Sequence, residues 1–127
     1  MAYAEKTKVP VSQSKGDIEK LVKKYGAEAF GILERQGHAQ IVFSLMDRNI
    51  VFRMTLPEDV QQERSMWRAI LLTVKGKLES AERGIETFED AFLANIVMPD
   101  GRTVSETTRP AIESSYSGND VPLLPHY

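Results

Sequence analysis

The sequence predicts an α+β fold, in which a small antiparallel β-sheet of three to four strands is packed on one face by a long central helix and shorter helices. Two patterns carry this prediction. Between Glu58 and Arg83 the apolar residues recur every three or four positions, which places them along one side of a helix. Between Ala39 and Leu56 they alternate with other residues, which is typical of strands that bury one face.

The composition is that of an ordinary globular protein. The 127 residues are 42% hydrophobic and 27% charged, and a chain of this length removes roughly two-thirds of its surface from water as one domain. We expect a single domain over residues 1–127, with a polar lead-in at 1–13 and an extended tail at 119–127. The sequence has no cysteine, no secretion signal and no apolar run near the ~18 residues of a membrane span, so the predicted location is the cytoplasm.

The long helix is the predicted centre of the core. Trp67 is the only tryptophan, and burial of such a side chain contributes on the order of 3 kcal/mol. The apolar stripe of this helix consists of Trp67, Ile70, Leu71, Val74, Leu78, Ala81 and Ile85. Gly76 costs the helix about 1 kcal/mol relative to alanine, which predicts either a close approach of another backbone or an unselected surface glycine. Gly84 is expected to end the helix.

A shorter helix is predicted before the sheet. Pro10 favours an extended backbone over Lys8–Val11, because proline disfavours helix at the residue before it, and it suits an edge strand. Ser14 is the expected N-cap of a helix that ends at Tyr25.

Three strands are predicted at residues 29–35, 39–46 and 50–56, joined by turns at 36–38 and 47–49. The alternation puts one set of side chains on the core face: Ile41, Phe43, Leu45, Ile50, Phe52, Met54 and Leu56. The opposite face is predicted to carry Gln40, Val42, Ser44, Val51, Arg53 and Thr55.

The C-terminal part is predicted to be helical in two places. Thr87 and Asp90 form a capping pair for a short helix, and Thr103 with Glu106 caps a last helix that we expect to bend at Pro110. The tail at 119–127 has little polarity, and we expect it to dock on the body of the protein.

The sequence contains no recognisable catalytic constellation. There is no phosphate-binding glycine loop, no HExxH and no Gly-x-Ser-x-Gly, and the only histidines are His38 and His126. We therefore predict neither an enzyme nor a cofactor. Five carboxylates near the end of the long helix suit either a solvated acidic surface or an oxygen-rich Mg²⁺ or Ca²⁺ site. They are Glu79, Glu82, Glu86, Glu89 and Asp90.

Five basic residues form the candidate nucleic-acid or nucleotide-binding site. They are Arg48, Arg53, Arg64, Arg68 and Lys75. Lysine and arginine contacts to phosphate supply most of the affinity of non-specific nucleic-acid binding, which makes such residues the natural candidates. The open sheet face lacks the exposed aromatic residues that stack bases. In the alternative interpretation the arginines pair with nearby acids such as Glu63, and the sheet face is solvated or covered by the chain ends.

Charge is unevenly distributed along the chain. Residues 1–24 carry six lysines against three acids, and residues 84–127 carry two arginines against seven acids. The leading hypothesis is a non-enzymatic accessory protein that binds nucleic acid or a nucleotide through the basic residues. The alternative is an inhibitor that binds a basic surface of a host defence protein, or sequesters a signalling nucleotide; its contact residues are Glu86, Glu89, Asp90 and Asp100. A homodimer through the sheet or the long helix fits both hypotheses, and no membrane contact is expected.

Five runs of the sequence resemble a family of small phage- and prophage-encoded proteins of unassigned function. The runs are VPV (9–11), KKYGA (23–27), NIVFRMTLP (49–57), MWRAILLTVKGKLES (66–80) and TFEDAFLANIVMPDGRTV (87–104). This resemblance implies a viral context inside a host cell and no catalytic residues. The predicted order of helix, three strands and helix is also similar to that of double-stranded-RNA-binding domains, whose second helix starts with a lysine cluster. Here that segment reads EDVQQERSM, which is acidic.

Overall fold

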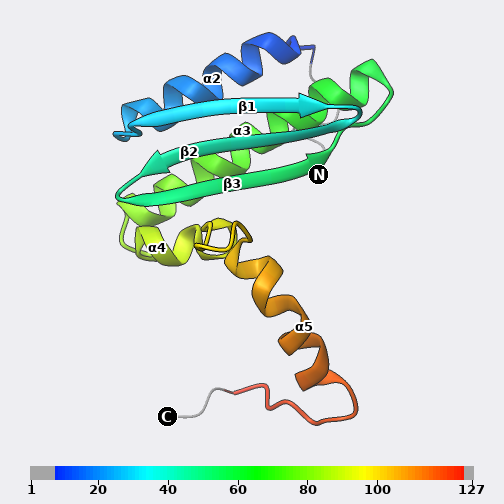
Figure 1. The fold of residues 1–127 in the computed structure, drawn as a ribbon. Coiled ribbons are helices and arrows are strands. Elements are labelled where there is room, and N and C mark those ends of the chain that lie inside the picture. Colours follow the sequence, from blue (N-terminus) through cyan, green and yellow to red (C-terminus); the bar gives the residue numbers. More distant parts are fainter. Residues whose placement is uncertain (1–7, 125–127) are drawn as a thin grey trace.

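The computed structural model describes residues 8–124, which form four α-helices, one short 3₁₀ helix and a three-stranded sheet (Figure 1). The elements are α2 (Val11–Lys24), β1 (Ala29–Arg35), β2 (His38–Leu45), β3 (Arg48–Thr55), α3 (Val60–Glu82), α4 (Phe88–Ala91), η1 (Leu93–Asn95) and α5 (Val104–Tyr116). The predicted α+β fold is confirmed. None of these helices is long and apolar enough to cross a lipid bilayer.

The sheet is an antiparallel meander in the order β1-β2-β3. Its second turn differs from the prediction of a turn at 47–49. Leu45 pairs with Arg48, so the turn consists of Met46 and Asp47 alone, and both residues have positive φ angles of 51° and 60°. Two consecutive positive φ angles match the twist of the flanking strands in a two-residue hairpin. β2 and β3 therefore begin and end one or two residues earlier than the pattern alone indicates, whereas β1 has the predicted bounds.

One face of the sheet, the inner face, is covered by α2 and α3 (Figure 1). Ile41, Phe43, Leu45 and Ile50 are buried there, as predicted. From α3 the core receives the fully buried Trp67 together with Leu71, Val74 and Leu78, whereas Ile85 lies beyond the end of the helix and is exposed. Phe92, which follows α4, meets Phe43 edge-on at 5.9 Å between ring centroids. The core therefore lies between the inner face and the helices.

The opposite face, the outer face, is covered only over β3. Ile96 bridges to Ile50, the backbone amide of Val97 donates to the carbonyl of Asn49, and the side chain of Asn95 donates to the carbonyl of Val51, so residues 95–97 pair with the free edge of β3. From this edge the chain turns over the outer face, where Gly101 and Glu106 contact Arg53. Val51, predicted to lie on an open surface, is consequently only 2% exposed. Within residues 8–124 the cover comes from residues 95–106, because η1 brings this segment back beside β3.

The N-terminal predictions need correction. α2 starts at Val11, four residues earlier than predicted, and its N-cap is Pro10. A proline at a helix start loses nothing by lacking an N–H, since the first amides of a helix have no intrahelical partner, and its φ of −59° is already suitable. Ser14 is therefore inside the helix, and residues 8–10 belong to no strand. Residues 1–7 of the predicted lead-in lie outside the described part of the chain.

Of the two interpretations of Gly76, the exposed surface glycine is the one the structure supports: outside its neighbours and the backbone of its own helix, no atom lies within 4 Å of a Cβ built there. The prediction that the tail docks is wrong for the described residues 119–124, which are exposed. By contrast, the caps predicted at Thr87 and Thr103 are both present, the second as a full capping box with Glu106.

Candidate functional site

The five predicted basic residues are distributed over separate surfaces of the molecule. Arg48, at the start of β3, pairs with Glu89 of α4 at 2.8 Å, and Arg68 of α3 pairs with Asp17 of α2 at 3.2 Å. Arg53 lies on the outer face, whereas α3 covers the inner face. The structure therefore does not bring Arg53 together with the basic residues of α3.

Arg64, Arg68 and Lys75 do lie on one side of α3, because their spacings of four and seven residues return to nearly the same direction at 3.6 residues per turn. Among the described residues, Arg64 and Lys75 have no ion-pair partner, whereas Arg68 is engaged by Asp17. This row on α3 is the remaining part of the predicted basic site.

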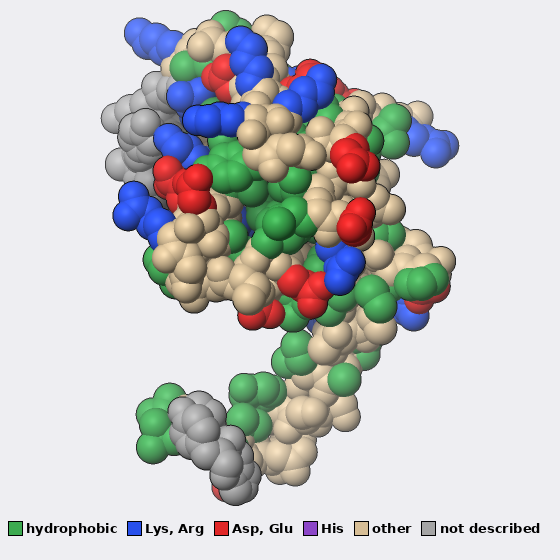
Figure 2. Space-filling model, turned by 90° about the vertical axis from the view of Figure 1, so that its left-hand side faces the viewer, with side chains coloured by type: hydrophobic (Ala, Val, Ile, Leu, Met, Phe, Trp, Pro, Cys, Tyr) green, Lys and Arg blue, Asp and Glu red, His purple; other side chains and the backbone are tan. Residues whose placement is uncertain are grey.

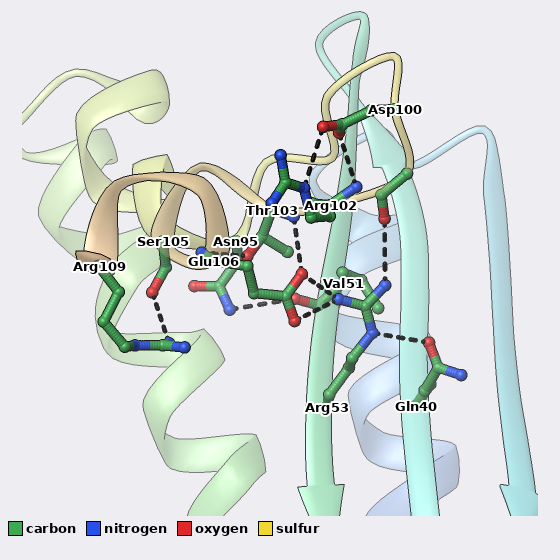
Figure 3. A network of polar contacts seen from close by, with 11 residues as sticks. Gln40, Val51, Arg53, Asn95, Asp100, Arg102, Thr103, Ser105, Glu106 and Arg109 are labelled. Carbon is green, nitrogen blue, oxygen red and sulfur yellow. Dashed lines mark hydrogen bonds and ion pairs between the residues drawn. The ribbon is translucent and has the colours of Figure 1, made fainter. Parts of the chain in front are cut away.

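Arg53 is the centre of a polar network on the outer face, shown in Figure 3. Its Nη1 atom lies 2.5 and 2.6 Å from the two carboxylate oxygens of Glu106, its Nη2 donates to the carbonyl of Gly101, and its Nε donates to Gln40. We call this network the clasp. It joins β2 and β3 to the loop before α5 and to the first turn of α5.

Glu106 has two structural roles at once. Its carboxylate accepts from the backbone amide of Thr103, which completes the capping box of α5, and it also accepts from Arg53. Hydrogen bonds from Arg53, followed by that of Thr103, lower the pKa of Glu106 from 4.5 to about 2. The carboxylate is therefore ionised at neutral pH and fixes the direction in which α5 leaves the sheet.

A second feature is an apolar cavity at the end of the molecule where α2 and α3 finish, which the sequence analysis did not anticipate. The cavity measures about 330 Å³ and is lined by Tyr25, Leu45, Met46, Leu78, Ala81, Glu82 and Phe88. We call it the end pocket. Figure 2 shows this face of the molecule, with hydrophobic side chains gathered at its centre and acidic side chains around them.

The rim of the end pocket has an acidic and hydrogen-bonding character. The Tyr25 hydroxyl donates to Glu82 Oε1 at 3.2 Å, and desolvation followed by the charge of Glu82 raises the pKa of Tyr25. The nearby chain from residue 79 to residue 90 contains five acids and one arginine, Arg83. One carboxylate, that of Glu89, is neutralised by Arg48. The rim therefore keeps a negative charge.

Met46 contributes to the same pocket from the β2–β3 turn. Its φ of 51° lies in the left-handed region, which is uncommon for a residue other than glycine, asparagine or aspartate. Its side chain lines the pocket and is nevertheless 68% exposed. The two-residue turn that requires this backbone conformation thus holds an apolar side chain at the mouth of an apolar cavity.

The predicted divalent-metal alternative has no geometric support in residues 8–124. No three of the acids, with or without histidine, converge into a group that would hold a metal ion there. Glu86 instead accepts from the Ser80 hydroxyl at 2.7 Å, and Glu89 is paired with Arg48. Asp100, in the loop before α5, is bonded to Arg102, whose backbone amide is the main cause of its lowered pKa.

The end pocket was not predictable from periodicity. Leu45 and Leu78 were correctly assigned to core faces. The pattern does not reveal that the sheet and the helices leave an open cavity between them at this end. The one signal was Phe88, a large apolar residue with acids on both sides, Glu86 before it and Glu89 and Asp90 after it.

Comparison with known proteins gives no further assignment: no family model, no curated protein and no solved structure matches this chain.

Proposed function

We propose that this chain is a non-enzymatic binding protein that engages a segment of a partner protein at the end pocket. The partner segment presents an apolar side chain flanked by lysine or arginine. The observation that carries this proposal is the combination of an open apolar cavity with an acidic rim at one end of the fold. In the context implied by the resemblance to small phage proteins, the partner is a host protein that the chain inhibits.

The apolar walls support the first half of this proposal. A cavity of about 330 Å³ is within the usual range of ligand pockets, ~300–1,000 Å³. Leu45, Leu78, Ala81 and Phe88 supply its walls, and Tyr25 with Glu82 supplies one polar edge. This arrangement suits one large apolar side chain with a hydrogen-bond donor next to it, at the polar edge of the pocket.

The acidic rim supports the second half. An unfilled apolar surface attracts many partners, and charge complementarity selects among them and accelerates association. Residues 79–90 carry five acids against one arginine, and Arg48 neutralises Glu89, so an excess of three negative charges remains. A basic segment gains from this field, and an acidic segment is repelled by it.

The test uses fluorescein-labelled decapeptides with one leucine or phenylalanine flanked by lysines, titrated with the full chain at low and physiological salt. We expect binding that weakens as salt increases, and a loss of at least about tenfold, ~1.4 kcal/mol, in Ala81→Phe, which fills the cavity. The matched control is Ala94→Phe, placed on an exposed residue of η1. The proposal would be refuted if Ala81→Phe bound the peptides as tightly as the wild type does. It would also be refuted if peptides with glutamate flanks bound as tightly as those with lysine flanks.

A second candidate function, phosphate-backbone binding, is favoured by the row of Arg64, Arg68 and Lys75 on α3. Three phosphate contacts on duplex DNA give a log–log salt slope of about −2.7, so affinity would fall ~40-fold for a fourfold rise in salt. We expect Lys75→Ala to reduce this slope by about one, whereas Arg102→Ala, whose arginine is paired with Asp100, leaves the slope unchanged. Absence of binding to single- and double-stranded DNA and RNA at low salt would remove this candidate.

A further inference from the structure

The most unusual feature of the molecule is the C-terminal arm, by which we mean residues 107–124. Every residue of the arm is exposed, and Figure 1 shows α5 pointing away from the sheet and the helices. Its large apolar side chains are nevertheless numerous. They are Ile112, Tyr116, Val121, Leu123 and Leu124, with exposed fractions from 43% to 97%. Contiguous exposed apolar residues of this kind mark an interaction site.

The arm is presented in a fixed direction. The clasp bonds Glu106, in the first turn of α5, to Arg53 of the sheet, and Thr103 caps the helix. The following turns of α5 project from this anchored turn without buried residues. A helix that is anchored at one end and pre-organised beyond it has less entropy to lose when it binds.

The same molecule has an open apolar surface of matching size. Residues 95–106 cover the outer face over β3, and no other part of residues 8–124 covers this face over β1 and β2. The exposed Leu33 lies there with the half-buried Gly31 and Val42, and a shallow hollow of about 360 Å³ runs along Gly31, Val42 and Val97. α5 has 13 residues, or about 20 Å of helix, and β1 has 7, or about 23 Å of strand.

Charge also matches across these two surfaces. With Arg53 already engaged by Glu106, the remaining charged side chain on the outer-facing positions of the described strands is Arg35. The arm carries Glu113 and Asp120 against Arg109, so its net charge is −1. A positive sheet face and a negative arm attract each other.

We infer that the arm of one copy lies across β1 and β2 on the outer face of a second copy, and that the arm of the second copy lies across the same strands of the first. A two-fold exchange makes two equal contacts, so each needs to bury only about 800 Å² for the pair to reach the ~1,600 Å² of a stable interface. On the partner, the arm then extends over β1 and β2 the layer that residues 95–106 form over β3. This inference does not rest on the function proposed for the end pocket, because none of the residues that line the pocket belongs to the arm or faces outward from β1.

The first test is the mass in solution of the full chain, measured by sedimentation equilibrium. We expect a dimer, with a dissociation constant that rises at least tenfold in Ile112→Asp and in Leu33→Glu. Ser114→Asp is the matched control, because Ser114 is two residues, about 200°, from both Ile112 and Tyr116 on the helix. A monomeric wild type, or a dimer unaffected by Leu33→Glu, would overturn the inference; the latter would indicate arm-to-arm pairing.

The second test uses the absence of cysteine from the chain. Leu33→Cys and a size-tagged Ile112→Cys are mixed and oxidised gently. We expect a mixed disulfide between the two variants to form faster than either self-linked product. The control replaces Ile112→Cys with Ser114→Cys. If the mixed product is no more abundant than in this control, the arm does not lie on β1 and the inference fails.

Discussion

Ser14 shows how much one side chain depends on where a helix begins. Its hydroxyl, suited to capping, is fully buried instead and has no hydrogen-bond partner among the described residues. A buried polar group without a partner costs about 1–3 kcal/mol. The cost exists because α2 begins at Val11 and carries Ser14 into contact with the core.

Replacing Ser14 by alanine is therefore expected to stabilise the protein by about 1 kcal/mol, since the substitution removes an unsatisfied hydroxyl and favours the helix. The measurement is the free energy of unfolding in urea. Ser12→Ala is the matched control, because Ser12 is exposed in the same turn of α2 and reports helix propensity alone. Destabilisation by Ser14→Ala beyond the Ser12 control would show that the hydroxyl has a partner.

Glu106 makes stability depend on pH in a defined window. Its pKa is lowered from 4.5 to about 2 in the folded protein, so its contribution is fully present above the unfolded value and is lost as the pH falls through the folded value. We expect wild type to exceed Glu106→Gln in unfolding free energy at pH 7, and this difference to shrink between pH 4.5 and 2. Glu113→Gln, on the exposed arm, is expected to show no such trend.

At the scale of the element, α3 contains one glycine, Gly76, whose replacement is expected to stabilise the helix. Gly76 is exposed inside the helix, and an added Cβ would meet no atom within 4 Å apart from its neighbours and the backbone of its own helix. Gly76→Ala is expected to raise the free energy of unfolding by about 1 kcal/mol, because glycine loses more backbone entropy than alanine in a helix. Thermal and urea unfolding measure this change. A neutral or destabilising result would indicate a contact to Gly76 that the structure does not show.

The elements also show where a sequence is informative. The periodicities of 3.6 and 2 predicted α3, the three strands and their buried faces, because each pattern reflects the side that meets the core. The caps at Thr87 and Thr103 were predicted because capping depends on residues three positions apart. The start of α2 and the two-residue turn at Met46 were missed because the same local residues suit more than one start or turn. The covered Val51 was missed because the cover comes from a segment 44 residues away in the chain.

The candidate site was less predictable than the fold. Arg48, Arg53 and Arg68 were chosen as phosphate-binding cations, and each of them has a carboxylate partner from a distant element. Spacing along the chain does not reveal such pairs. The end pocket is likewise formed by four elements that meet only in three dimensions. The functional assignment therefore rests on cavities and exposed surfaces and not on motifs.

At the scale of the whole molecule, the exchange of arms that we infer would couple stability to concentration. Any species that binds only the folded state raises the apparent stability by mass action. We expect the Tm of the wild type to rise as protein concentration increases, because the folded dimer is favoured. The Tm of Ile112→Asp is expected to be independent of concentration, and that of Ser114→Asp to follow the wild type. Calorimetric scans over a hundredfold range of concentration would decide this.

The meander has a consequence for the speed of folding. β1, β2 and β3 are neighbours both in the chain and in the sheet, and each connection has two residues. Sheet pairing therefore requires no long loop to close, whereas bringing α2 against α3 joins segments about 50 residues apart, as in the Asp17–Arg68 ion pair. We expect the two hairpins to form early in the transition state and the docking of α2 to follow.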